Sequence, residues 1–169
     1  MKTIRLETFS YRFAEQVLNG QLALKQELED ILLDTGPLLP SLSRPEYNRV
    51  LDDHFVAKGW ERQPAVFDEK GDPTAKIDFL KSRVGIEVQF GHSSFIGIDL
   101  LKFQVASYSG LDKIDVGVYV TTTKKFKKYL ISEFGQKWEG SLDFEKVVRY
   151  LPHFKSAIQV PVYVIGITV

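Results

Sequence analysis

Two acids and an amide within one short segment are the side chains of this sequence that are best suited to chemistry. Asp78 precedes Glu87 by nine positions, and Gln89 follows two positions later. Successive side chains of a β-strand point to opposite faces, so Glu87 and Gln89 would project together. The opposite face would be apolar, because it carries Ile86, Val88 and Phe90. This strand would therefore present functional groups on one face and pack into a core with the other.

A β-hairpin would bring the two acids together. A tight connection around Ser82 separates two runs with strand character, 74–80 and 84–90. If the chain reverses there, Asp78 falls almost opposite Glu87 on the neighbouring strand. Like charges at short range disfavour ionisation unless a cation lies between them. Spacing alone leaves two interpretations open, a metal site or an exposed hairpin whose polar face happens to carry two acids.

A hard divalent cation would resolve the repulsion between Asp78 and Glu87. Mg²⁺ prefers oxygen ligands and keeps several waters, so two carboxylates, the Val88 carbonyl and a phosphate oxygen would complete its shell. Such an ion polarises a phosphate and lowers the pKa of a bound water, which supplies a nucleophile near neutral pH. Gln89 cannot act as a base, but its amide can orient the water or contact the phosphate.

The elements around the hairpin alternate between helices and strands. Apolar spacings of three or four predict an amphipathic helix over 11–34, broken near Gly20, and a second helix from the N-cap Ser43 to Gly59. The remaining predicted elements are a short strand at 65–67, a turn at 69–73, helices at 98–107, 123–133 and 142–150, and buried strands at 114–120 and 160–169.

This order of elements indicates an α/β fold with a central mixed β-sheet flanked by α-helices. We expect one domain over residues 1–169, with an N-terminal helical part at 1–60 and a catalytic core at 61–169. The predicted helix at 11–34 could cover the sheet, which is the more common fate, or form an interface between subunits.

The composition excludes several classes of protein. With 169 residues, 44% of them hydrophobic, the chain can bury a single core. No apolar run reaches the roughly 18 residues of a membrane span, and the first residues lack the apolar stretch of a signal peptide, so we expect a cytoplasmic protein. The absence of cysteine excludes disulfides and Cys-ligated zinc.

Charge is unevenly distributed along a chain whose net charge is zero. Residues 1–53 carry six Lys and Arg against nine Asp and Glu, whereas residues 81–128 carry eight against four. A polyanion-binding face would therefore belong to the second half. The densest basic run would place Lys124, Lys125 and Lys128 on the outer side of the helix at 123–133, where phosphate contact and plain solvation are equally compatible.

The segment with the two acids resembles the active-site hairpin of the BglII/BstYI restriction endonucleases, a group within the PD-(D/E)xK nuclease superfamily. The likeness rests on Ile77-Asp78-Phe79, the interval of nine residues, and Glu87-Val88-Gln89-Phe90. Gln89 stands where most of the superfamily has lysine, and the BglII/BstYI group shares this departure. The helix before Lys58-Gly59-Trp60-Glu61 is also similar, so the likeness covers roughly residues 45–108.

The resemblance implies a restriction-endonuclease-like core in which Asp78 and Glu87 bind Mg²⁺, with Mn²⁺ as a possible substitute. It adds the Val88 carbonyl as a ligand and gives Gln89 the place of the usual lysine. Gln63 is a candidate for an accessory amide near the strand that leads to the hairpin. Candidate DNA contacts near the hairpin are Lys76 and Lys81, for which solvation is the more common role, and His92 and Ser93 in the following loop.

The resemblance also implies double-stranded DNA as the partner and a homodimer as the active form, because cutting both strands of a palindrome requires two active sites related by a two-fold axis. Three functions fit the sequence: a type II restriction endonuclease, a repair or defence nuclease with little sequence preference, and a catalytically silent module that binds DNA or a protein.

Overall fold

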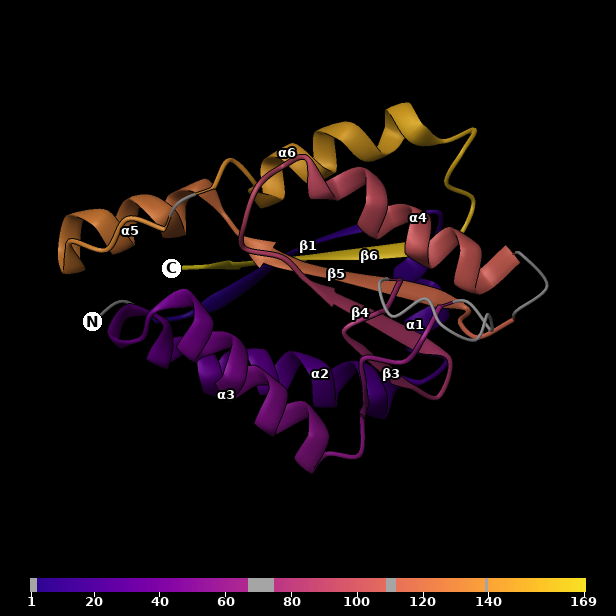
Figure 1. The fold of residues 1–169 in the computed structure, drawn as a ribbon, viewed down its shortest axis with the longest axis horizontal. Coiled ribbons are helices and arrows are strands. Elements are labelled where there is room, and N and C mark those ends of the chain that lie inside the picture. Colours follow the sequence, from indigo (N-terminus) through magenta and orange to yellow (C-terminus); the bar gives the residue numbers. More distant parts are fainter. Residues whose placement is uncertain (1–2, 67–74, 109–111, 139) are drawn as a thin grey trace.

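A computed structural model describes residues 3–66, 75–108, 112–138 and 140–169. These residues form a mixed six-stranded sheet in the order β1-β6-β5-β4-β3-β2, with helices on both faces (Figure 1). The central strands β4 (Val84–Val88), β5 (Val116–Thr122) and β6 (Val162–Thr168) are parallel to one another. The outer strands β1 (Arg5–Tyr11), β3 (Phe79–Lys81) and β2 (Glu61–Arg62) pair in antiparallel fashion. The predicted fold class is confirmed.

Two hydrophobic cores lie on the two faces of this sheet. Helices α1 (Ala14–Asn19), α2 (Leu22–Thr35) and α3 (Arg44–Ala57) cover one face, together with the short 3₁₀ helix η1 (Gly36–Ser41). Helices α4 (Phe95–Tyr108) and α6 (Phe144–Tyr150) cover the other, and the 3₁₀ helix η2 (Leu151–Phe154) follows α6. Helix α5 (Lys124–Phe134) adds its apolar side to the first core.

The N-terminal region differs from the prediction of a purely helical part. Residues Arg5–Tyr11 form the edge strand β1, which pairs with β6 from Arg5 opposite Thr168 to Tyr11 opposite Val162. The predicted helix at 11–34 is interrupted at Gly20, as expected, into α1 and α2. Helix α2 buries Leu28 and Leu32 against the sheet, so at least this part of the segment covers its own core.

Helix α3 forms where the capping residues predict it. Ser43 is the N-cap, and its hydroxyl accepts a hydrogen bond from the Glu46 backbone amide while the Glu46 carboxylate accepts one from the Ser43 amide. Pro45 occupies the first turn, where no backbone donor is needed. Gly59, with φ of 81°, turns the chain out of the helix toward β2.

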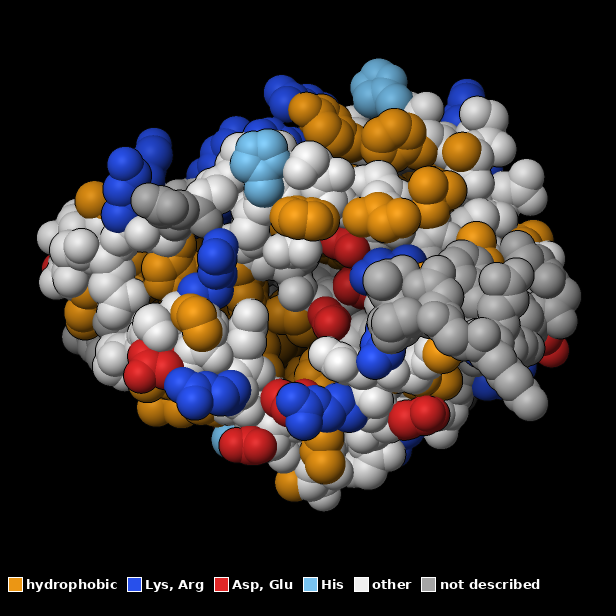
Figure 2. All heavy atoms as spheres, viewed as in Figure 1, with side chains coloured by type: hydrophobic (Ala, Val, Ile, Leu, Met, Phe, Trp, Pro, Cys, Tyr) orange, Lys and Arg blue, Asp and Glu red, His pale blue; other side chains and the backbone are white. Residues whose placement is uncertain are grey.

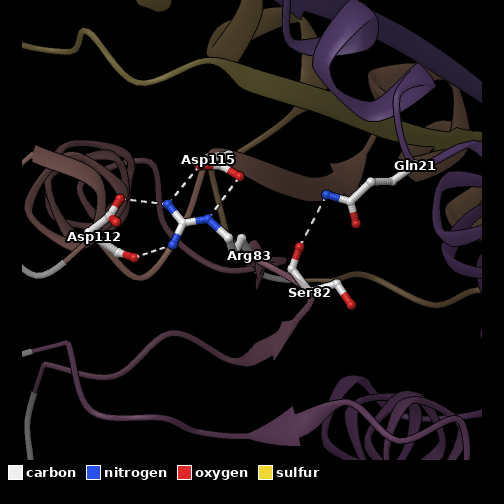
Figure 3. Close-up of polar contacts among 5 residues, drawn as sticks. All are labelled: Gln21, Ser82, Arg83, Asp112 and Asp115. Atoms are coloured by element: carbon white, nitrogen blue, oxygen red, sulfur yellow. Dashed lines mark hydrogen bonds and ion pairs between the residues drawn. The ribbon is translucent and has the colours of Figure 1, made fainter.

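The hairpin between β3 and β4 has the expected turn. Ser82 and Arg83 adopt positive φ values of 47° and 66°, as a two-residue hairpin turn with the correct twist requires. Arg83 forms ion pairs with Asp112 and Asp115, and Gln21 donates a hydrogen bond to the Ser82 carbonyl (Figure 3). These contacts tie the turn to the segment before β5 and to the α1–α2 junction.

Two predicted strands are wrong in extent. Of the expected strand at 65–67, the described residues 65 and 66 form only an isolated bridge between Ala65 and Lys76, and Glu61–Arg62 pairs with β3 instead. The expected strand at 74–80 is regular only from Phe79. The predicted turn at 69–73 lies outside the described residues. A buried proline, Pro64, which has no amide hydrogen for a sheet ladder, accounts for part of this irregularity.

The other predicted elements are confirmed with small shifts. Helix α4 begins three residues earlier than expected, while α5 and α6 start at the N-caps Thr123 and Asp143, whose side chains accept hydrogen bonds from the third helical amide. Strands β5 and β6 are buried along their full length. Among the described helices, none combines the length and apolar character that would let it cross a membrane.

Candidate active site

Asp78 and Glu87 lie opposite each other on adjoining strands. Phe79 pairs with Ile86, and the same register places Asp78, one residue before β3, beside Glu87 and Val88 in β4. Asp78 Oδ2 accepts a hydrogen bond of 2.8 Å from the Val88 amide, which fixes the carboxylate against β4. The hairpin therefore brings together the two acids that the spacing predicted to face each other.

Helix α4 adds two charged residues that the sequence analysis did not include. Lys102 Nζ lies 2.6 Å from Glu87 Oε1 and 3.1 Å from Asp99 Oδ1. The Tyr119 hydroxyl in β5 donates a hydrogen bond of 3.0 Å to Asp99 Oδ2. The site is thus built from the hairpin, the helix that follows it and the central strand.

The signal for Asp99 and Lys102 was present in the sequence. Both are charged residues in the apolar run Ile98-Asp99-Leu100-Leu101-Lys102-Phe103, and they are three positions apart, so they share one side of a helix. A charged pair that is buried with an apolar helix face needs a polar partner. The sequence did not identify Glu87 as this partner, because Glu87 comes close to Lys102 only when β4 and α4 pack together.

Burial dominates the electrostatics of the two hairpin acids. Glu87 is only 3% exposed, and this burial, with a further contribution from the Asp78 charge, raises the pKa of Glu87 to about 9. Burial also raises the pKa of Asp78, against the opposing effect of the Val88 amide. The Glu87 and Asp99 charges outweigh desolvation and raise the pKa of Lys102, which stays an ammonium. Burial thus disfavours the charged form of both acids, and a divalent cation between them would favour it.

The donor set fits a hard divalent cation. Glu87 Oε1 is buried, and the Lys102 ammonium lies 2.6 Å from it. When all four groups are ionised, the carboxylates of Asp78, Glu87 and Asp99 and the Lys102 ammonium together carry a charge of minus two. Residues 3–66, 75–108, 112–138 and 140–169 contain no group of three or more acids and histidines arranged as metal ligands. Two carboxylates and a carbonyl match Mg²⁺, which keeps several waters.

A cavity of about 210 Å³ opens beside Asp78 and Val88. Its other polar lining residues are Asn48, Arg49, Asp52, Arg62 and Gln63. In Figure 2 this side of the molecule is hollowed, with acidic side chains inside the hollow and Lys and Arg side chains around it. A basic rim around an acidic centre suits a phosphate that approaches a metal ion.

Gln63 lies next to Asp78, as its predicted accessory role requires. Its backbone amide donates a hydrogen bond of 2.8 Å to the Asp78 carbonyl, and its φ of 50° places it in the left-handed region. The side chain is exposed and lines the cavity. The structure therefore brings Gln63 to the site through its backbone.

Gln89 presents a hydrogen-bond donor beyond the end of β4. Its Oε1 accepts a hydrogen bond of 3.0 Å from the Gly91 amide. Because a backbone amide only donates, the bonded atom must be the side-chain oxygen, which leaves the Nε2 hydrogens for a water or a phosphate. The Gly91 contact thus fixes the polarity of the Gln89 amide.

Replacing Gln89 by glutamate should therefore reduce cleavage by about 10- to 100-fold, since it exchanges the Nε2 donor for a negatively charged oxygen near the phosphate. The Gly91 hydrogen bond can persist in the variant, so the melting temperature should stay within a few degrees of the wild-type value. Single-turnover cleavage of a DNA duplex measures the effect. A wild-type rate in Gln89→Glu would remove Gln89 from the site.

The candidate DNA contacts fall into different environments. Lys81 Nζ lies 2.7 Å from Glu27 Oε1 and also donates a hydrogen bond to the Lys58 carbonyl. The Lys81 side chain is therefore engaged in contacts within the fold. His92 contacts the Ser94 hydroxyl, and Ser93 contacts the Ser141 hydroxyl at 2.7 Å. The structure thus anchors the loop after β4 to the segment before α6.

The remaining lysines are more accessible. Lys76 is half-buried, and its carbonyl accepts a hydrogen bond from Lys102. Lys124, Lys125 and Lys128 are exposed on α5, whereas Phe126, Tyr129 and Leu130 are buried, as predicted. Because β4 and β5 are parallel, α5 starts at the same end of the sheet as Gln89, which follows β4. These lysines are therefore available to a DNA backbone that extends past this end.

A mixed sheet between helices, with two acids facing each other on one hairpin, defines a nuclease of the restriction-endonuclease-like fold. The family model of restriction endonuclease BglII/BglIII matches residues 6–167. The chain therefore belongs to this family and is a DNA endonuclease of the restriction type.

A solved structure supports the same fold. The structure of restriction endonuclease BglII complexed with a DNA 16-mer is similar with a TM-score of 0.72 and 20% sequence identity, over 96% of this chain and 75% of that chain. No curated protein sequence matches the chain.

Proposed function

We propose that the chain is a Mg²⁺-dependent type II restriction endonuclease that hydrolyses phosphodiester bonds in double-stranded DNA. The observation that carries the proposal is the pairing of Asp78 and Glu87 across the hairpin, where burial and the Asp78 charge both act against the ionised Glu87 carboxylate. Family membership and the likeness to BglII support DNA as the substrate. An enzyme with this substrate would act in the cytoplasm, where the DNA lies.

Each residue then has a defined task. Asp78, Glu87 and the Val88 carbonyl would hold Mg²⁺, or Mn²⁺ in its place. When bound, the ion supplies a polarised phosphate and a water of lowered pKa. The Val88 amide orients the Asp78 carboxylate, and Gln89 Nε2 can orient the water or contact the phosphate. Gln63 and the arginines that line the cavity would receive the DNA backbone.

Incubation of the purified protein with phage DNA and Mg²⁺ tests the function. Discrete fragments support a site-specific endonuclease, and their ends give the recognition sequence. A smear would replace this proposal with a nuclease of little sequence preference, and intact DNA with Mg²⁺ or Mn²⁺ would replace it with a silent DNA-binding module. Addition of EDTA should stop cleavage, and excess Mg²⁺ should restore it.

A second copy of the chain is the proposed partner of the outer face of α4. Phe95, Ile98 and Leu101 are exposed on this face, and Leu101 and Phe154 line an apolar groove of about 140 Å³. Contiguous exposed apolar side chains mark interaction sites. A second copy is the proposed occupant, because cleavage of both strands of a palindrome needs two active sites related by a two-fold axis.

Leu101→Glu should convert the dimer to a monomer, because the carboxylate would be buried against an apolar surface. Sedimentation velocity measures the change, and on a supercoiled plasmid the variant should accumulate nicked circles. Ile131→Glu is the matched control, since Ile131 is also exposed but lies on α5. A dimeric Leu101→Glu variant, or a monomeric wild-type protein, would rule out this interface.

A further inference from the structure

Lys102 is a charged group of the site that bridges three segments of the chain. Its ammonium contacts Glu87 Oε1 at 2.6 Å in β4, Asp99 Oδ1 at 3.1 Å on its own helix, and the Lys76 carbonyl at 3.0 Å. An ammonium has three donors, and these contacts supply three acceptors. Lys76 lies two residues before Asp78, so Lys102 links the segments that carry both hairpin acids.

The Lys102 ammonium lies between the Glu87 and Asp99 carboxylates, where a cation is needed. Glu87 and Asp99 are both buried and would repel each other strongly without a positive charge between them. Asp99 already uses its second oxygen, Oδ2, to accept the Tyr119 hydroxyl. Any further ion that used Asp99 together with Glu87 would therefore have to displace Lys102.

We propose that Lys102 is a resident cation that occupies the place of a second divalent ion, so that the site binds one Mg²⁺ or Mn²⁺ per chain. Lys102 is a positioning residue in this arrangement, because it acts through Glu87 and Asp99. The inference rests on the proposed metal site at Asp78 and Glu87, and it adds the number of ions and the reason for that number.

Charge and anchoring explain why a second metal ion would not replace the ammonium. One divalent ion already balances the local charge of minus two that remains when Lys102 is counted. A second ion would bring an excess of positive charge into a buried site, where charges are costly. It would also separate the Lys76 carbonyl and the Asp99 carboxylate from their donor. Without the ammonium, three carboxylates would face one divalent ion. The site would then keep an excess of negative charge that favours a second ion.

The test is a titration of the metal-free protein with Mn²⁺ in the absence of DNA, with free Mn²⁺ followed by electron paramagnetic resonance. The wild-type chain should bind one ion. Lys102→Met, which removes the charge but keeps a long side chain, should bind two. The double variant Lys102→Met with Asp99→Asn should return to one, because the second ion needs Asp99.

Matched variants separate the charge of Lys102 from other effects. Lys155→Met removes the same charge from an exposed position after η2 and should bind one ion. Lys102→Gln keeps a hydrogen-bond donor without the charge and should bind two ions, which provides a second neutral variant if Lys102→Met does not fold. Circular dichroism of each variant checks the fold before titration.

The outcomes separate this inference from the proposed function. Two ions bound to the wild-type chain, or one ion bound to a folded neutral variant of Lys102, would overturn the resident-cation role and leave the proposed nuclease intact. No ion bound to the wild-type chain would overturn the metal site itself, and with it the inference. One ion in the wild type and two in the neutral variants support both.

Discussion

Asp78→Asn and Glu87→Gln should each reduce DNA cleavage by roughly a thousandfold or more, because each would remove a charged oxygen ligand from the proposed Mg²⁺, whose stabilisation of the transition state would amount to several kcal/mol. Both substitutions keep the shape of the side chain. The asparagine oxygen can still accept the hydrogen bond from the Val88 amide, so the hairpin should persist. The expected result is a folded protein that binds DNA and does not cut it.

The measurement pairs cleavage with DNA binding. Single-turnover cleavage of the recognition duplex gives the loss in rate, and fluorescence anisotropy gives the affinity for the same duplex in Ca²⁺. Asp53→Asn is the control, because Asp53 is an exposed acid on α3 that undergoes the same change of charge and shape. Wild-type rates in both Asp78→Asn and Glu87→Gln would remove the hairpin from the chemistry.

The second large effect is on stability as a function of pH. Glu87 has an ordinary pKa of 4.5 and a pKa of about 9 in the folded, metal-free protein, chiefly because it is buried. The unfolded chain therefore releases this proton at a lower pH than the folded chain. The stability that comes from the protonated carboxyl is complete below pH 4.5 and is lost as the pH rises toward 9.

Comparison of wild type with Glu87→Gln isolates this contribution. Without metal, the melting temperature of the wild type should fall relative to the variant between pH 5 and 9, by on the order of 10 °C. Saturating Mn²⁺ should raise the wild-type value most at the high end of this range, because a bound cation favours the ionised carboxylate. Differential scanning fluorimetry gives both curves. Parallel curves for the two proteins would mean that Glu87 titrates normally.

The hairpin could be predicted from the sequence because its determinants are local. Alternation between apolar and polar residues set the faces of β4, and the short connection at Ser82 and Arg83 set the register that places Asp78 beside Glu87. Helix α3 was equally local, since Ser43, Pro45 and Gly59 mark its two ends. Such signals do not depend on the rest of the chain.

The parts that could not be predicted depend on distant contacts. Residues Arg5–Tyr11 carry too few apolar residues for a clear strand pattern, and they become β1 only because β6 offers them an edge. The partnership of Lys102 with Glu87 needs α4 to fold back over β4 and β5. The exposed apolar face of α4 was likewise hidden in an apolar run that gave no sign of which side would stay exposed.

The pairing of β1 with β6 also constrains the order in which the protein can be completed. Residue 5 pairs with residue 168, so β1 leaves the ribosome well before β6 and waits for it before it gains a neighbour in the sheet. Contacts between such distant residues close slowly because of the loop entropy that must be overcome. The acidic hairpin closes over a few residues and can form early. A chain without β6 would thus carry the paired acids without the closed sheet that supports them, and nuclease activity would await the addition of β6.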